Sequence, residues 1–167
     1  EKRSIAPRVP RWNAENCIQC GICASACPHA VIRTKLAVVD SLKDAPASFK
    51  TLEAKPGDGE RFKLQIFCED CTGCGVCVDQ CPINASKPET PALTWSTIEE
   101  EIAVGELINE KFFSELPDNV MGKNTTKTIK GAMLRKPLFE FSGACAGCGE
   151  TPYVKLASQL FGENMIV

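Results

Sequence analysis

The sequence lacks the features that mark several classes of protein. No apolar run approaches the roughly 18 residues of a membrane-spanning helix, and the first residues do not have the pattern of a signal peptide. Lysine and arginine are scattered, and the formal net charge is −2, so there is no basic stripe for nucleic acid. The chain begins with glutamate rather than methionine. We therefore expect an internal section of a longer protein, with neither a membrane nor a nucleic acid as partner.

Cysteine, in contrast, is abundant. The 167 residues include 11 cysteines, and most of them stand three or four positions apart. This spacing fits a metal or cluster better than the disulfide framework of a secreted protein. We therefore expect a reducing, cytoplasmic location. The 44% share of hydrophobic residues is that of a globular protein.

Two segments, 17–28 and 71–82, repeat the pattern Cys-x₂-Cys-x₂-Cys-x₃-Cys-Pro. Three closely spaced thiolates can reach three corners of one [4Fe–4S] cube, and in two-cluster ferredoxins the fourth cysteine ligates the other cube. The sequence therefore predicts two cubes with crossed ligands. Cluster one takes Cys17, Cys20, Cys23 and Cys81, and cluster two takes Cys71, Cys74, Cys77 and Cys27. Gly21 and Gly75 would let backbone N–H groups approach the cluster sulfurs.

Structural zinc is the competing interpretation of these cysteines. Two Cys-x₂-Cys pairs suffice for tetrahedral zinc, so the third cysteine of each loop would be surplus, and we favour the clusters. Cys68 cannot replace Cys71, because that frame would need a cysteine at Val78. We interpret Cys68 as an ordinary small residue and His29 as a solvent-facing loop residue. The stretch 57–59, Gly-Asp-Gly, resembles a thiamine-enzyme metal motif but stands in a turn, so we expect no such role there.

The chain divides into three stretches, 1–90, 91–140 and 141–167. In the first, residues 62–67 alternate as a half-buried strand does. In the second, Ser96 with a glutamate three residues later predicts the start of a helix that ends by Pro117, and an extended connector follows over 118–137.

The third stretch ends in a predicted helix that Thr151 caps and Gly162 follows. Its apolar residues share one face: Val154, Ala157, Leu160 and Phe161. An apolar run at 165–167 then predicts the start of a strand. We interpret this stretch as the beginning of an incomplete α/β domain.

The segment Gly-Ala-Cys145-Ala-Gly-Cys148-Gly-Glu150-Thr-Pro-Tyr is not ferredoxin-like. Together with the two cysteine repeats, it closely resembles the pyruvate:ferredoxin oxidoreductases, which are thiamine-diphosphate enzymes, over essentially the whole chain. The resemblance implies an α+β architecture: a two-cluster ferredoxin-like domain over 1–90, a linker with a helix over 91–140, and the start of the thiamine-diphosphate domain over 141–167. It also implies that Cys145 and Cys148 ligate a third [4Fe–4S] cluster and that Glu150 contacts the thiamine diphosphate.

The resemblance further implies the function. The whole enzyme, with thiamine diphosphate and Mg²⁺, would convert pyruvate and coenzyme A to acetyl-coenzyme A and carbon dioxide. This section would pass single electrons to an external ferredoxin or flavodoxin, without catalytic residues of its own. The remaining domains and a second copy in a homodimer are the other expected partners. Two alternatives stay open: a free-standing dicluster ferredoxin, and a zinc-stapled interaction module without redox work.

Overall fold

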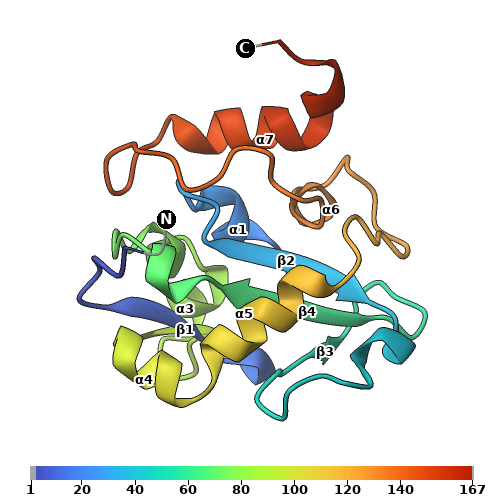
Figure 1. The fold of residues 1–167 in the computed structure, drawn as a ribbon, viewed down its shortest axis with the longest axis horizontal. Coiled ribbons are helices and arrows are strands. Elements are labelled where there is room, and N and C mark those ends of the chain that lie inside the picture. Colours follow the sequence, from blue (N-terminus) through green and yellow to red (C-terminus); the bar gives the residue numbers. More distant parts are fainter. Residues whose placement is uncertain (1–2, 167) are drawn as a thin grey trace.

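The computed structural model describes residues 3–166, and its frame is two small antiparallel sheets (Figure 1). Strand β1 (Val9–Trp12) pairs with β5 (Leu93–Ser96). Strand β2 (Ile32–Ala37) pairs with β4 (Arg61–Ile66), and the short β3 (Leu52–Glu53) joins the other edge of β4. The strand before the first cysteine segment therefore pairs with the strand after the second, and the two inner strands pair with each other. This exchange interlocks the two halves of the sequence repeat.

Short helices surround the sheets. The described α-helices are α1 (Ile22–Ala26), α2 (Val76–Asp79), α3 (Pro82–Ser86), α4 (Ile98–Ala103), α5 (Glu106–Glu115), α6 (Ile129–Met133) and α7 (Thr151–Phe161). The 3₁₀ turns are η1 (Ala14–Asn16), η2 (Val39–Leu42), η3 (Cys68–Asp70) and η4 (Gly162–Asn164). Helices α6 and α7 pack together beyond α1, at the opposite end of the molecule from α4 (Figure 1). Within residues 3–166, no helix is long and apolar enough to cross a membrane.

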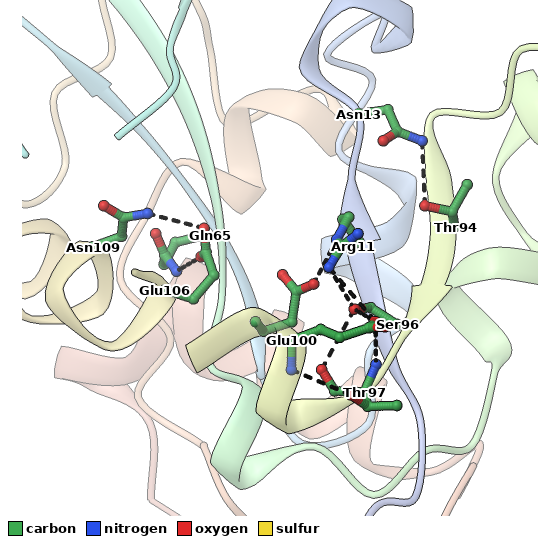
Figure 2. A network of polar contacts seen from close by, with 10 residues as sticks. Arg11, Asn13, Gln65, Thr94, Ser96, Thr97, Glu100, Glu106 and Asn109 are labelled. Atoms are coloured by element: carbon green, nitrogen blue, oxygen red, sulfur yellow. Dashed lines mark hydrogen bonds and ion pairs between the residues drawn. The ribbon is translucent and has the colours of Figure 1, made fainter. Parts of the chain in front are cut away.

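The helix predicted to begin at Ser96 is two helices, and its first cap is one residue later. Thr97 Oγ1 accepts a hydrogen bond from the Glu100 backbone N–H, and the Glu100 carboxylate accepts one from the Thr97 N–H, both at 3.2 Å (Figure 2). Ser96 instead belongs to β5 and hydrogen-bonds Arg11 of β1 at 2.8 Å. Gly105, with φ of 96°, separates α4 from α5, because few residues other than glycine adopt that backbone conformation.

Strand β4 was predicted to be half-buried, and that prediction is wrong: residues 62–67 are all buried. The polar face of β4 is covered by α5, which follows β5, and by Phe49, which precedes β4 in the chain. Gln65 donates a hydrogen bond to Glu106 of α5 at 2.6 Å (Figure 2). The Lys63 ammonium lies 4.6 Å from the centre of the Phe49 ring. The alternation in the sequence is real, but a second layer covers its polar side.

The extended connector predicted for 118–137 contains a helix, α6. Thr128 caps it by accepting a hydrogen bond from the Gly131 N–H at 3.1 Å. Met133 and Leu134 are buried in the main hydrophobic core, and the Met133 carbonyl accepts a hydrogen bond from Thr34 of β2 at 2.8 Å. This short segment is helical because it packs on α1 and β2, which its local sequence does not reveal.

Helix α7 occupies the predicted residues but buries a different face. Lys155, Ser158 and Gln159 are buried, whereas Phe161 is 62% exposed. The N-cap position is Glu150 rather than Thr151, and Glu150 makes no side-chain capping bond. Residues 165–166 form no strand, and residue 167 lies outside the described residues.

Candidate iron-sulfur cluster sites

The structure gathers the cysteines of the two repeats around two separate cavities. One is lined by Cys17, Cys20, Cys23 and Cys81. The other is lined by Cys27, Cys71, Cys74 and Cys77. We call them cavity one and cavity two. In each, three cysteines come from one loop and the fourth from the other repeat, which is the grouping expected for crossed ligation.

The exchange of the fourth cysteine follows from the interlocked strands. Cys27 ends α1 and leads towards β2, which pairs with β4 directly before the second cysteine loop. Cys81 ends the second loop and leads through α3 to β5, which pairs with β1 before the first loop. Each fourth cysteine is therefore delivered to the loop of the other repeat.

Both loops have the same backbone shape. Gln19 and Gly73 occupy equivalent positions with φ of 60° and 69°, and Gly21 and Gly75 follow with φ of 78° and 84°. The Gln19 N–H donates to the Sγ of Cys17 at 3.4 Å, and the Gly73 N–H donates to the Sγ of Cys71 at 3.3 Å. Such N–H donors stabilise a thiolate. Gln19 takes the left-handed conformation without being glycine, and its buried side chain bonds the Glu53 carbonyl at 2.7 Å.

Burial favours the protonated form of four thiols in these loops. Desolvation raises the pKa of Cys71 to about 11 and raises the pKa values of Cys17, Cys23 and Cys77 as well. Neighbouring thiolates add to the effect by like-charge repulsion. A cationic centre in each cavity would reverse this balance, because iron stabilises coordinated thiolates and releases their protons.

Each cavity is lined by four cysteines, the number of ligands that a four-iron cube takes. Among residues 3–166, no three His, Cys, Asp or Glu side chains converge closely enough to hold one ion. A four-iron cube needs its thiolates spread around a larger body. Trp12 lines cavity one and His29 lines cavity two, and neither Trp12 Nε1 nor His29 Nε2 makes a hydrogen bond of normal geometry with the described residues. Cluster sulfurs would supply acceptors at both places.

The third cysteine pair lies next to cavity two. A Cβ atom built on Gly147 would stand 3.6 Å from the Cβ of Cys74, so the 145–148 loop contacts the second cysteine loop. Cys145 is exposed and Cys148 partly exposed. Backbone N–H groups of Thr151 and Glu150, at the start of α7, lower the pKa of Cys148. Among residues 3–166, Cys145 and Cys148 belong to no group of three or more His, Cys, Asp or Glu side chains close enough to hold a metal ion.

Helix α7 is attached to the loop that carries the fourth ligand of cavity two. The buried Lys155 ammonium donates hydrogen bonds to the carbonyl oxygens of Cys27 at 2.7 Å and Ser25 at 3.0 Å, and to that of Ala24. Its burial lowers the pKa of Lys155 to about 8. These carbonyls end α1, where a cation also complements the helix dipole.

Three residues singled out in the sequence have no place among the predicted ligands. Cys68 is 1% exposed and belongs to neither cavity. Burial and the adjacent Glu110 carboxylate raise its pKa to about 12. Asp58 of the Gly-Asp-Gly turn is exposed and pairs with Lys123 at 2.6 Å. The prediction of a solvent-facing His29 is wrong, because the residue is only 3% exposed. Its Nδ1 contacts the carbonyl oxygen of Ser142, far away in the sequence.

The comparisons with known proteins agree with this arrangement. Residues 16–85 match the family described as a 4Fe–4S dicluster domain. The chain is 50% identical over 169 residues to the pyruvate:ferredoxin oxidoreductase of Moorella thermoacetica. It is 46% identical over 170 residues to the pyruvate-flavodoxin oxidoreductase of Trichormus variabilis. Over its whole length, this chain is similar to one section of the pyruvate:ferredoxin and pyruvate-flavodoxin oxidoreductases.

The match to these oxidoreductases covers the whole chain but only a part of each relative. In both cases 100% of the chain aligns with 14% of the relative's length. A 44% identical match to the NADP⁺-dependent mitochondrial pyruvate dehydrogenase of Euglena gracilis covers 99% of the chain and 9% of that protein. The section therefore recurs in relatives whose names state different electron acceptors. Its architecture is a ferredoxin-like dicluster domain within a mixed α and β structure.

Proposed function

We propose that this chain is the electron-transfer section of a pyruvate oxidoreductase and that it carries single electrons through two [4Fe–4S] clusters. Cavity one would hold a cluster on Cys17, Cys20, Cys23 and Cys81, and cavity two a cluster on Cys27, Cys71, Cys74 and Cys77. The observation that carries the proposal is the gathering of these eight cysteines into two crossed sets of four. When bound, the clusters supply the one-electron chemistry.

The position of the third cysteine pair indicates the direction of electron transfer between the two clusters. Cys145 and Cys148 lie against the loop of cavity two, and we assign them as two ligands of a third cluster close to the thiamine. Glu150 would contact the thiamine diphosphate. Residues 141–167 would then begin the thiamine-binding domain, and electrons would enter at Cys145 and Cys148 and reach cavity two before cavity one.

Cavity one supplies the exit. Ile18 lines this cavity and is 55% exposed, so an apolar side chain stands at the surface beside the cluster loop. Ile18 would form part of the apolar centre of an interface with an external electron acceptor, because the buried centre of a protein interface is more apolar than its rim. The names of the relatives support ferredoxin or flavodoxin as that acceptor.

Anaerobic reconstitution of the full 167-residue chain tests the proposal. We expect about eight irons per chain, as two four-iron clusters require, and two reducible centres in electron paramagnetic resonance. The reduced chain should then be reoxidised by added ferredoxin or flavodoxin. Bound zinc alone, or an iron count near four, would contradict the two-cluster assignment. Clusters that fail to pass electrons to either acceptor would contradict the exit at cavity one.

A further inference from the structure

Each cluster cavity is lined by one residue with a buried side-chain nitrogen that the protein leaves without a well-formed hydrogen bond. Trp12 lines cavity one and His29 lines cavity two, and neither Trp12 Nε1 nor His29 Nε2 makes a hydrogen bond of normal geometry with residues 3–166. A buried N–H without an acceptor costs about 1–3 kcal/mol. Two such groups, one in each of two related cavities, point to an acceptor that belongs to the cavities themselves.

Trp12 stands at the end of β1, where its ring is fixed from both sides. It packs edge-on against Phe62 at 6.3 Å between ring centres, and the Lys63 ammonium lies 5.3 Å from the centre of its ring. The indole N–H lies close enough to Cys17 to lower the pKa of that thiol, against the larger opposite effect of burial. The N–H is therefore directed at the sulfur side of cavity one, and an indole nitrogen can only donate.

His29 is held at the side of cavity two by the segment that leads to Cys145. Its Nδ1 lies 3.1 Å from the Ser142 carbonyl oxygen and 3.2 Å from the Ser142 hydroxyl, and its own carbonyl accepts a hydrogen bond from the Phe141 N–H at 2.9 Å. Ser142 does not line cavity two; together with His29 it lines a different, smaller cavity. Nδ1 therefore contacts a residue outside cavity two. With the ring proton on Nε2, Nδ1 accepts a hydrogen bond from the Ser142 hydroxyl; with the proton on Nδ1, the ring donates to the Ser142 carbonyl. Only the first tautomer leaves an N–H at Nε2.

We propose that Trp12 and His29 are positioning residues for electron transfer, each donating a side-chain N–H hydrogen bond to the sulfurs of the cluster in its own cavity. This inference rests on the proposed function, because it needs the clusters. One added electron makes a cube more negative by one charge, with no bond to the donor formed or broken. A fixed N–H donor stabilises the reduced form more than the oxidised form and so raises the reduction potential.

The two donors give the experiment its own internal control. The full chain is reconstituted in three forms, wild type, Trp12→Phe and His29→Phe, and the two midpoint potentials are measured by redox titration with electron paramagnetic resonance. Each variant keeps an aromatic ring but loses its N–H. We expect each to lower one potential only, and a different one. Loss of one hydrogen bond to a charged group changes the reduced-to-oxidised ratio about tenfold, which is about 59 mV for one electron.

His29→Gln is the rescue variant, because the glutamine amide can donate from nearly the same place, and it should restore most of the lost potential. Potentials that stay unchanged in both Phe variants, or that shift together in each, would overturn the inference. The sequence contains one histidine, so ring-¹⁵N-labelled histidine reports on His29 alone, even if a variant fails to fold. We expect a nitrogen hyperfine coupling to one reduced cluster of the wild type, and its absence would overturn the role of His29. Failure of the wild type to bind about eight irons would instead contradict the proposed function.

Discussion

The Lys155 ammonium donates a hydrogen bond to the Cys27 carbonyl oxygen at 2.7 Å, and so joins the helix after Cys148 to the cysteine that crosses into cavity two. Lys155 is 2% exposed. Its two other bonds go to the last turn of α1. One buried side chain thus fixes the position of the third cysteine pair relative to the second cluster loop.

Lys155→Met should loosen this attachment. The substitution keeps the length of the side chain but leaves three buried carbonyls without their charged donor, and we expect a loss of about 2–4 kcal/mol of stability. Hydrogen exchange should rise in α7 and at the end of α1. The matched control is Lys111→Met, because Lys111 is an exposed lysine of α5. Equal effects of the two substitutions would contradict the role of Lys155.

Crossed ligation predicts which pairs of cysteine substitutions are redundant. Cys17→Ala with Cys81→Ala removes two ligands of the same cluster, so about four irons should remain, as after either single change. Cys71→Ala with Cys81→Ala removes ligands of different clusters, and almost no iron should remain. Iron analysis and electron paramagnetic resonance distinguish the two results. The reverse pattern would place Cys81 with the second loop.

Gly21→Ala should destabilise the chain more than the equivalent change at Gly75. Both glycines have positive φ, which costs alanine about 1–2 kcal/mol. At Gly21, the new Cβ would also come within 3.1 Å of the Lys130 Cα in α6, whereas at Gly75 the nearest atom is the Trp95 ring at 3.4 Å. Gly59→Ala is the control for backbone strain alone, because nothing lies within 4 Å of its Cβ position. Under anaerobic conditions, the Gly21→Ala variant should have the lowest thermal unfolding temperature of the three.

Lys63 should make the stability depend on alkaline pH. Burial lowers its pKa in the folded chain to about 8, whereas the unfolded value is about 10.4. Between these values the unfolded state binds more protons, so the contribution of Lys63 to stability rises with pH. The stability of the wild type relative to Lys63→Met should therefore increase by about 1–3 kcal/mol between pH 8 and pH 10. Unfolding temperatures of both proteins, measured at the two pH values, give this difference. A constant difference across that range would show that Lys63 is not titrating.

The cysteine spacing predicted the grouping around the two cavities because it reflects local geometry that the repeat imposes twice. Three cysteines in one loop face one centre, and the fourth leaves with the next element. The surroundings of the cavities were less predictable. His29 contacts Ser142, 113 residues away, and α7 buries Lys155 and Gln159 rather than the apolar face that its periodicity marks. Such contacts are decided by what packs on a segment, which no short window of sequence contains.

The pairing of β1 with β5 has a consequence for the order in which the protein matures. At roughly 5–20 residues per second, several seconds of synthesis separate Cys17 from Cys81, and β5 emerges later still. During that time the first loop has no fourth thiol and no partner strand. In the proposed arrangement, iron delivered early would meet three exposed thiols and no cavity. We therefore expect both clusters to be inserted after residue 96 has left the ribosome, as one event rather than two.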